Sequence, residues 1–158
     1  MHSENLISAD NQQGRLSPEW ITGFVDGEGC FSVSIFKNKT SKFGYQVFPE
    51  FVVAQGAKSL EVLEMMQEFF GCGKIYVNNR KDNHRENLYR YCVRSRKDIQ
   101  TIIVPFFERH QLLTAKRSDF EIFCRILQLM DDRLHLTESG FNTTKELAGS
   151  MNRRKKRT

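Results

Sequence analysis

Two acidic residues separated by one glycine, Asp26 and Glu28, lie where a helical sequence pattern ends. The negative end of the helix dipole and unpaired carbonyls are found at such a terminus, so acidic side chains are disfavoured there. A group of carboxylates and carbonyls is unfavourable unless a cation binds among them, and magnesium prefers these oxygen ligands. The residue types and their spacing therefore indicate a divalent-metal site, which could support metal-assisted hydrolysis.

The helix that positions these acids is predicted from its first residue onward. Ser17 is a good N-cap, and Pro18 suits the first helical position. Gly23 and Gly27 lie four residues apart and would leave a groove in which a second backbone can approach closely. The apolar residues at helical spacing are Trp20, Ile21, Phe24 and Val25.

The remaining elements follow the helix in two similar groups. Strands are expected at 30–37, 45–54, 74–79 and 88–95, and helices at 59–70, 98–104, 115–130 and 144–151. Ser59 and Asp98 are the expected caps of two of these helices, Gly71 ends one, and Pro105 curtails another. Pro49 suggests an irregularity or an edge position in the second strand.

This order predicts an α+β fold with two hairpins in one antiparallel sheet. The helices would cover one face of the sheet, and the opposite face would remain open and polar. Residues 1–158 are expected to form a single domain, with a flexible segment at 1–15 and a basic tail at 152–158. In the second hairpin, the residues expected to face inward are Ile75, Val77, Tyr91 and Val93.

Composition restricts the class of partner. The chain has 158 residues, a net charge of +5 and a pI of about 9.1, which modestly favours a polyanionic partner. The four cysteines lie singly and are expected to be reduced thiols and not zinc ligands. No segment is apolar enough to span a bilayer, and the glycine pattern differs from a dinucleotide-binding loop, so neither a membrane nor a nucleotide cofactor is expected.

The motif itself carries a family resemblance. Residues 21–29 read ITGFVDGEG, which resembles the signature of LAGLIDADG homing endonucleases, and the family's usual strand follows. The sequence departs from the common pattern with Thr22 in place of a small alanine and Glu28 in place of aspartate. Neither departure removes a metal-binding carboxylate. The resemblance implies the αββαββα fold, whose open sheet face lies in the major groove of DNA.

The resemblance also implies roles for residues of the active site. Glu28 and the carbonyl of Gly27 would bind the metal, which is expected to be Mg²⁺, with Mn²⁺ or Ca²⁺ able to substitute for binding. Asp26 either binds metal as well or bonds to the backbone at the turn.

Several further residues resemble polar or basic residues that lie near the active site in some members of the family. Gln55 lies near the scissile phosphate or is only a polar residue at a strand end, whereas Lys116 is expected near the active site, where its charge could stabilise the phosphate. Arg117 is a rival for the role of Lys116, and the roles of Lys58 and Ser59 are left open.

Basic and aromatic residues alternate on the predicted open face. Ordinary solvent exposure explains the serines and asparagines but not Phe36, Phe48 and Tyr76 among basic residues. Such a surface suits a duplex groove, where arginine can bind guanine and apolar groups meet thymine methyls. The residues predicted to contact double-stranded DNA are Ser32, Ser34, Phe36, Asn38, Gln46, Phe48, Glu50, Lys74, Tyr76, Asn78, Arg80, Arg90 and Arg94.

A single motif per chain implies a homodimer, because each active site of the family lies beneath a pair of motif helices. The expected dimer contact runs through Gly23 and Gly27, and the expected activity is a double-strand break in a long, near-palindromic DNA target. Location in a mitochondrion or chloroplast follows from the resemblance alone. The sequence is also compatible with two other functions: an intron-encoded RNA maturase, or a DNA-binding protein of the same fold that has lost catalysis.

Overall fold

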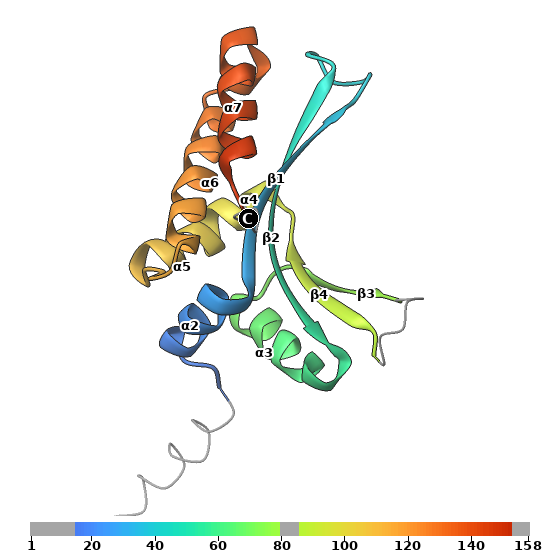
Figure 1. Ribbon diagram of the computed structural model, residues 1–158, viewed down its shortest axis with the longest axis vertical. Coiled ribbons are helices and arrows are strands. Elements are labelled where there is room, and N and C mark those ends of the chain that lie inside the picture. The colour runs from blue at the N-terminus through green and yellow to red at the C-terminus, as the bar shows by residue number, and fades with distance from the viewer. Residues whose placement is uncertain (1–14, 80–85, 153–158) are drawn as a thin grey trace, which may run out of the picture.

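The computed structural model describes residues 15–79 and 86–152, which form one curved antiparallel sheet with helices gathered on one side (Figure 1). The first half contains α2 (Pro18–Glu28), β1 (Gly29–Lys37), β2 (Tyr45–Gly56), the 3-10 turn η1 (Ala57–Ser59) and α3 (Leu60–Phe70). The second half contains β3 (Lys74–Asn78), β4 (Leu88–Val93), α4 (Arg96–Asp98), η2 (Ile99–Ile103), α5 (Val104–Arg109), α6 (Lys116–Asp131), η3 (Leu134–Leu136) and α7 (Glu138–Ser150).

The sheet has the strand order β1-β2-β4-β3, and every neighbouring pair is antiparallel. Phe31 pairs with Phe51, which in turn pairs with Val93, so these side chains point to the same face. All three are fully buried beneath the helices. The predicted arrangement of two hairpins with helices on one face is therefore confirmed.

Aromatic packing joins this face of the sheet to the helices. The ring of Phe31 lies 5.2 Å from that of Phe51, 5.5 Å from Phe107 of α5 and 5.4 Å from Phe123 of α6. The Phe31–Phe107 pair is edge-to-face, a favourable geometry for aromatic rings. This cluster fixes β1, and therefore the position at which α2 ends, relative to α6.

Several local predictions are confirmed. The Ser17 side chain accepts a hydrogen bond from the Trp20 amide at 3.1 Å, and Pro18 is the first residue of α2. Gly71 ends α3 in the left-handed conformation, with φ of 66°. Pro49 pairs only with Val33 of β1, because the pairing of β2 with β4 starts two residues later, so the proline does occupy a local edge.

Two predicted caps are wrong. Ser59 lies at the N-cap position of α3 but makes no side-chain capping bond, because its backbone already belongs to the 3-10 turn η1. Asp98 does not cap a helix either; the side chain of Ser95 accepts a hydrogen bond from the Asp98 amide at 3.3 Å.

The prediction that Pro105 shortens its helix is also wrong. The chain remains helical from α4 through the π-helical segment η2 into α5, and Pro105 lies at the start of α5. Proline has no N–H, but this is tolerated in the first turn of a helix. The π-helical turn before α5 changes the hydrogen-bond register, so that Pro105 falls in such a first turn.

The last helix and the third strand also differ from expectation. α7 starts six residues earlier than predicted, where the Thr137 side chain accepts a hydrogen bond from the Gly140 amide at 3.1 Å. Its Phe141 stacks on Tyr45 at the β1–β2 hairpin, with ring centroids 4.8 Å apart, a long-range contact that the helical pattern did not reveal. Val77 is 50% exposed although it shares a face with the half-buried Ile75, because the core does not extend to this end of β3.

The helices of the described ranges include none that is both long and apolar enough to cross a membrane. The expectations for 1–15 and 152–158 fall almost entirely outside these ranges. Within them, Asn152 joins the end of α7 to the sheet: its side-chain amide donates to the Phe31 carbonyl at 2.8 Å.

Candidate metal and nucleic-acid site

Glu28 is the last residue of α2, and its side chain is exposed. The helix ends through a hydrogen bond from the Gly29 amide to the Val25 carbonyl, after which the chain enters β1 directly. The carbonyl of Gly27 therefore lies in the last turn, where carbonyls lack helical partners. A carboxylate and a carbonyl oxygen are thus both present at this helix end and accessible to a cation.

Asp26, the other acid of the motif, is engaged within the chain. Its carboxylate accepts hydrogen bonds from the Leu113 amide at 2.7 Å, the Thr114 amide at 3.1 Å and the Thr114 hydroxyl at 2.8 Å. These donors offset the unfavourable end of the helix dipole, so Asp26 needs no metal ion for this purpose. Asp26 was expected either to bind metal or to bond to the backbone at the turn. The structure supports a bond to backbone, but the backbone amides belong to the loop before α6, which is distant in sequence.

Lys116 lies beside the same helix end. Its ammonium group donates a hydrogen bond to the carbonyl of Gly29, the residue that follows Glu28. The backbone amide of Lys116 bonds to the Thr114 hydroxyl at 3.3 Å. Asp26 therefore holds the loop from which α6 starts, and this loop brings a lysine 88 residues along the sequence from Glu28 to the candidate metal site.

The hydrogen bonds to Asp26 predict a pH-dependent contribution to stability. Burial raises the pKa of Asp26, but the hydrogen bonds from Leu113 and Thr114 and the charge of Lys116 outweigh this effect, and the pKa lies below its ordinary value of 3.8. A carboxylate whose pKa is lower in the folded state stabilises the protein above its unfolded pKa and loses this effect as pH falls through the folded pKa.

We therefore expect Asp26→Asn to lower the free energy of unfolding by about 1 kcal/mol near neutral pH, because the amide retains only one acceptor and no charge. The difference from the unsubstituted chain should shrink below pH 3.8. Denaturant unfolding at several pH values measures both effects. A difference that stays constant across this pH range would contradict the assigned hydrogen-bonding role.

Gln55 lies at the end of β2 near this site. Val53 pairs with Gly29, so Gln55 extends two residues past the first residue of β1, towards the end of α2. It is half-buried, and its catalytic role stays a prediction. The Lys58 amide bonds to Glu86 at 3.2 Å, so its backbone fixes the approach to β4, and the structure adds no role for the Ser59 side chain.

The outer surface of α2 is open. Ile21 and Val25 face the core, while Gly23 and Gly27 are exposed, and a Cβ atom added at either glycine would meet no atom within 4 Å outside the local helix backbone. Trp20 is 42% exposed and stacks on Phe24, with ring centroids 4.8 Å apart. Phe24 is half-buried and packs against the edge of the core, so the exposed apolar part of this helix is formed by Trp20 and the two glycines.

The pairing register places most predicted DNA-contacting residues on the open face of the sheet. Ser34 pairs with Phe48 and Phe36 with Gln46, whereas Tyr76 pairs with Arg90. Phe36 and Tyr76 are 46% and 39% exposed, respectively. Other predicted residues that share this face are Ser32, Glu50, Lys74, Asn78 and Arg94.

Three of the residues predicted to contact DNA differ from the others in their surroundings or lie outside the described ranges. Asn38 lies in the β1–β2 turn, and its side chain already bonds to Gln46 at 3.0 Å and to the Thr40 amide at 3.0 Å. Arg80 lies outside the described residues. Glu50 faces the open side but is only 9% exposed, because Arg90 and Arg94 lie against it.

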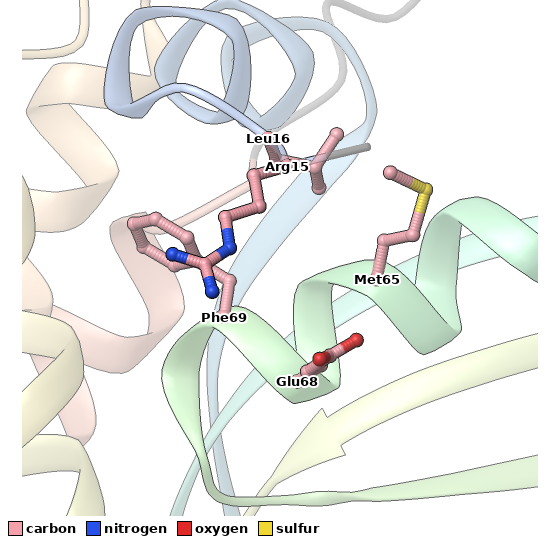
Figure 2. A pocket seen from close by; sticks show the side chains of 5 residues that line it. All are labelled: Arg15, Leu16, Met65, Glu68 and Phe69. Atoms are coloured by element: carbon pink, nitrogen blue, oxygen red, sulfur yellow. The ribbon is translucent and has the colours of Figure 1, made fainter. Parts of the chain in front are cut away.

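A separate hollow lies at the opposite end of α2. Figure 2 shows that Arg15 and Leu16, just before α2, face Met65, Glu68 and Phe69 of α3 around about 360 Å³. This hollow lies near the first residues of α2, whereas Glu28 is the last residue of that helix. It therefore does not form part of the candidate metal site.

Comparison with known proteins identifies the family. Residues 21–127 match the LAGLIDADG endonuclease family, which covers more than half of the chain. The chain belongs to this family. It is 35% identical over 144 residues to the probable intron-encoded endonuclease 3 of Neurospora crassa, a match that covers 91% of this chain but 26% of that protein. It is also 27% identical to the DNA endonuclease I-CvuI of Chlorella vulgaris, over 75% of this chain and 68% of that one.

Solved LAGLIDADG structures confirm the fold. The homing endonuclease I-TnaI matches with a TM-score of 0.80 and 42% identity, over 88% of this chain and 90% of that chain. I-SmaMI, bound to an uncleaved DNA target in the presence of calcium ions, matches with a TM-score of 0.79 and 34% identity. Here 87% of this chain covers 45% of that chain, so the fold described here corresponds to about half of I-SmaMI.

The residues present fit a LAGLIDADG metal site only in part. Over 15–79 and 86–152, the structure contains no group of three acidic, histidine or cysteine side chains that could hold a metal ion. Glu28 is exposed, but Asp26 is occupied by its hydrogen bonds. One chain therefore offers one accessible carboxylate and nearby carbonyls, and a metal ion bound there would need further oxygen ligands from DNA phosphates or a second chain.

The structure also shows what the sequence pattern missed. Leu113 and Thr114 hold Asp26 and thereby position Lys116, yet neither was singled out as functional. The stretch before α6 carries no periodic signal, and its partner is 87 residues away. A pattern of neighbouring residues therefore could not predict that the loop before α6 contacts the end of α2.

Proposed function

We propose that this chain is a homing endonuclease that makes a magnesium-dependent double-strand break in a long, near-palindromic DNA target. The observation that carries the proposal is the helix end where Glu28 is exposed while Lys116 is bound to the neighbouring Gly29 carbonyl. An accessible acid and a fixed cation at one point suit a reaction on a phosphate group. The relatives named as DNA endonucleases support the same reaction class.

The residues of the helix end have distinct tasks in this proposal. Glu28 and the Gly27 carbonyl would hold the metal ion, which would supply Lewis-acid activation of water and charge neutralisation for phosphodiester hydrolysis. Lys116 places a positive charge near the scissile phosphate, and Gln55 orients the attacking water or the phosphate by hydrogen bonding. Asp26 stays outside the reaction and keeps Lys116 in place.

Two chains assemble through the open face of α2. The glycines at 23 and 27 let the two helices approach closely, and Trp20 and Phe24 supply apolar area beside them. An isologous contact of this kind brings two Glu28 residues together at the two-fold axis. The open faces of the two sheets then lie along one duplex, which favours a target with two-fold symmetry.

Names of relatives support a location as well. Proteins similar to this chain are described as lying in ND4 intron 1 or as intron-encoded endonuclease Cox1-I1b. We propose that this chain is likewise intron-encoded and acts in an organelle.

The test of the proposed function is digestion of a randomised duplex library with magnesium, followed by sequencing of the cut ends. We expect cuts in both strands at a fixed stagger, within a recovered sequence that reads nearly the same on either strand. Removal of magnesium by a chelator should stop cutting. Binding to intron RNA without magnesium-dependent cutting would instead favour the maturase alternative and would contradict the proposal.

A further inference from the structure

Glu50 is the one charged side chain among the buried residues of the described chain. It is 9% exposed, yet it lies on the open face of the sheet, which it shares with Phe48, Arg90 and Arg94. Burial of a carboxylate is costly unless it is paired. A carboxylate in this position therefore requires partners of opposite charge.

Two arginines of β4 and its end converge on this carboxylate. The Nε of Arg94 donates to Oε2 of Glu50, and an Nη of Arg90 lies 3.5 Å from Oε1. Arg90 pairs with Ala54, four residues along β2 from Glu50, so its side chain runs along the strand to reach the carboxylate. Each carboxylate oxygen of Glu50 is therefore paired with a different arginine.

Arg94 is held on a second side. Its guanidinium carbon lies 4.5 Å from the ring centroid of Tyr76, in a cation–π contact. The guanidinium is therefore fixed both by the carboxylate at Nε and by the ring at its face. Recognition of guanine needs two N–H groups presented in one plane to N7 and O6, and the two terminal nitrogens of Arg94 can supply them.

We propose that Glu50 is a positioning residue for base recognition, which holds Arg94 and Arg90 in the orientation that reads guanine in the major groove. This inference rests on the proposed function, because it requires the open sheet face to bind DNA. Glu50 itself contacts no base, since the two arginines lie over its carboxylate. It acts by fixing side chains that would otherwise repel each other and move freely.

Base recognition and phosphate attraction respond differently to the loss of Glu50. Glu50, Arg90 and Arg94 together carry a charge of −1 + 1 + 1 = +1, which becomes +2 when the carboxylate is replaced by an amide. Phosphate attraction depends on charge and should rise, whereas recognition of guanine depends on orientation and should fall. A residue with only a structural role would lower both kinds of binding together.

The test measures calcium-supported binding of Glu50→Gln to a duplex library in which each target position is varied. We expect guanine preference to fall by roughly tenfold at one symmetric pair of positions. Binding to unrelated duplex should become tighter and more salt-dependent, by up to about one unit in the slope of log K against log salt. Glu64→Gln, the same change at an exposed acid of α3, is the control and should alter neither.

Arg94→Lys provides a second test that keeps the positive charge but removes the planar fork. It should lose guanine preference at the same pair of positions, and the combination with Glu50→Gln should lose little more. The proposal is overturned if Glu50→Gln keeps its guanine preference, or if specific and unrelated binding fall in parallel. If the unsubstituted chain binds all duplexes alike, the proposed function fails and this inference fails with it.

Discussion

Glu28→Gln should abolish magnesium-dependent cleavage, with a loss of roughly 10³-fold or more in rate. The substitution keeps the size and shape of the side chain but removes the one accessible carboxylate at the end of α2. Duplex binding in metal-free buffer should persist or become slightly tighter, because a negative charge near the DNA is removed. Cleavage rates and binding affinities on the same target separate these effects.

Glu61→Gln is the matched control for this change. Glu61 is an exposed acid in the first turn of α3, outside the proposed contact between chains. It should cut at the unsubstituted rate and bind equally well. If Glu28→Gln also cuts at that rate, Glu28 does not bind the metal, and the assignment of the active site is wrong.

Gly23→Leu should give a folded protein that neither dimerises nor makes double-strand breaks. A Cβ atom added at this position meets no atom within 4 Å outside the local helix backbone, and Gly23 is exposed, so the fold has room for a side chain there. Leucine is also a better helix former than glycine, by up to about 1 kcal/mol. In the proposed dimer, however, the same side chain would hold two α2 helices apart and separate the two Glu28 residues.

Thermal unfolding, sedimentation and cleavage assays together test this prediction. Gly149→Leu, in α7, is the control: this glycine is also exposed, a Cβ atom added there also meets no described atom within 4 Å outside the local helix backbone, and the position is far from α2 in the sequence. It should remain dimeric and active. A Gly23→Leu protein that still dimerises and cuts DNA would show that α2 is not the contact between chains.

The elements that carry the motif could be predicted because their signals are local. Ser17, Pro18 and the alternating residues of β1 determine where α2 starts and where the strand follows, and the register confirmed which side chains share a face. The same alternation failed for Val77, because parity along a strand does not tell whether a helix covers the sheet at that point.

The contacts that assemble the site could not be predicted in this way. Asp26 and Thr114 lie 88 residues apart, and their hydrogen bonds depend on how α6 packs against the sheet. The pairing of Glu50 with Arg90 and Arg94 depends likewise on strand order, since β2 and β4 are separated in sequence by α3 and β3. The alternation of residues along each strand predicted that these side chains lie on the open face of the sheet, but it did not predict which of them form ion pairs.

The central claim is that two chains bring their Glu28 residues together around metal on one DNA duplex. Native mass spectrometry of the chain with a selected target in calcium measures this directly. We expect two chains per duplex with bound calcium, and fewer calcium ions in the same complex of Glu28→Gln. One chain per duplex, or an unchanged calcium count in the variant, would contradict the claim.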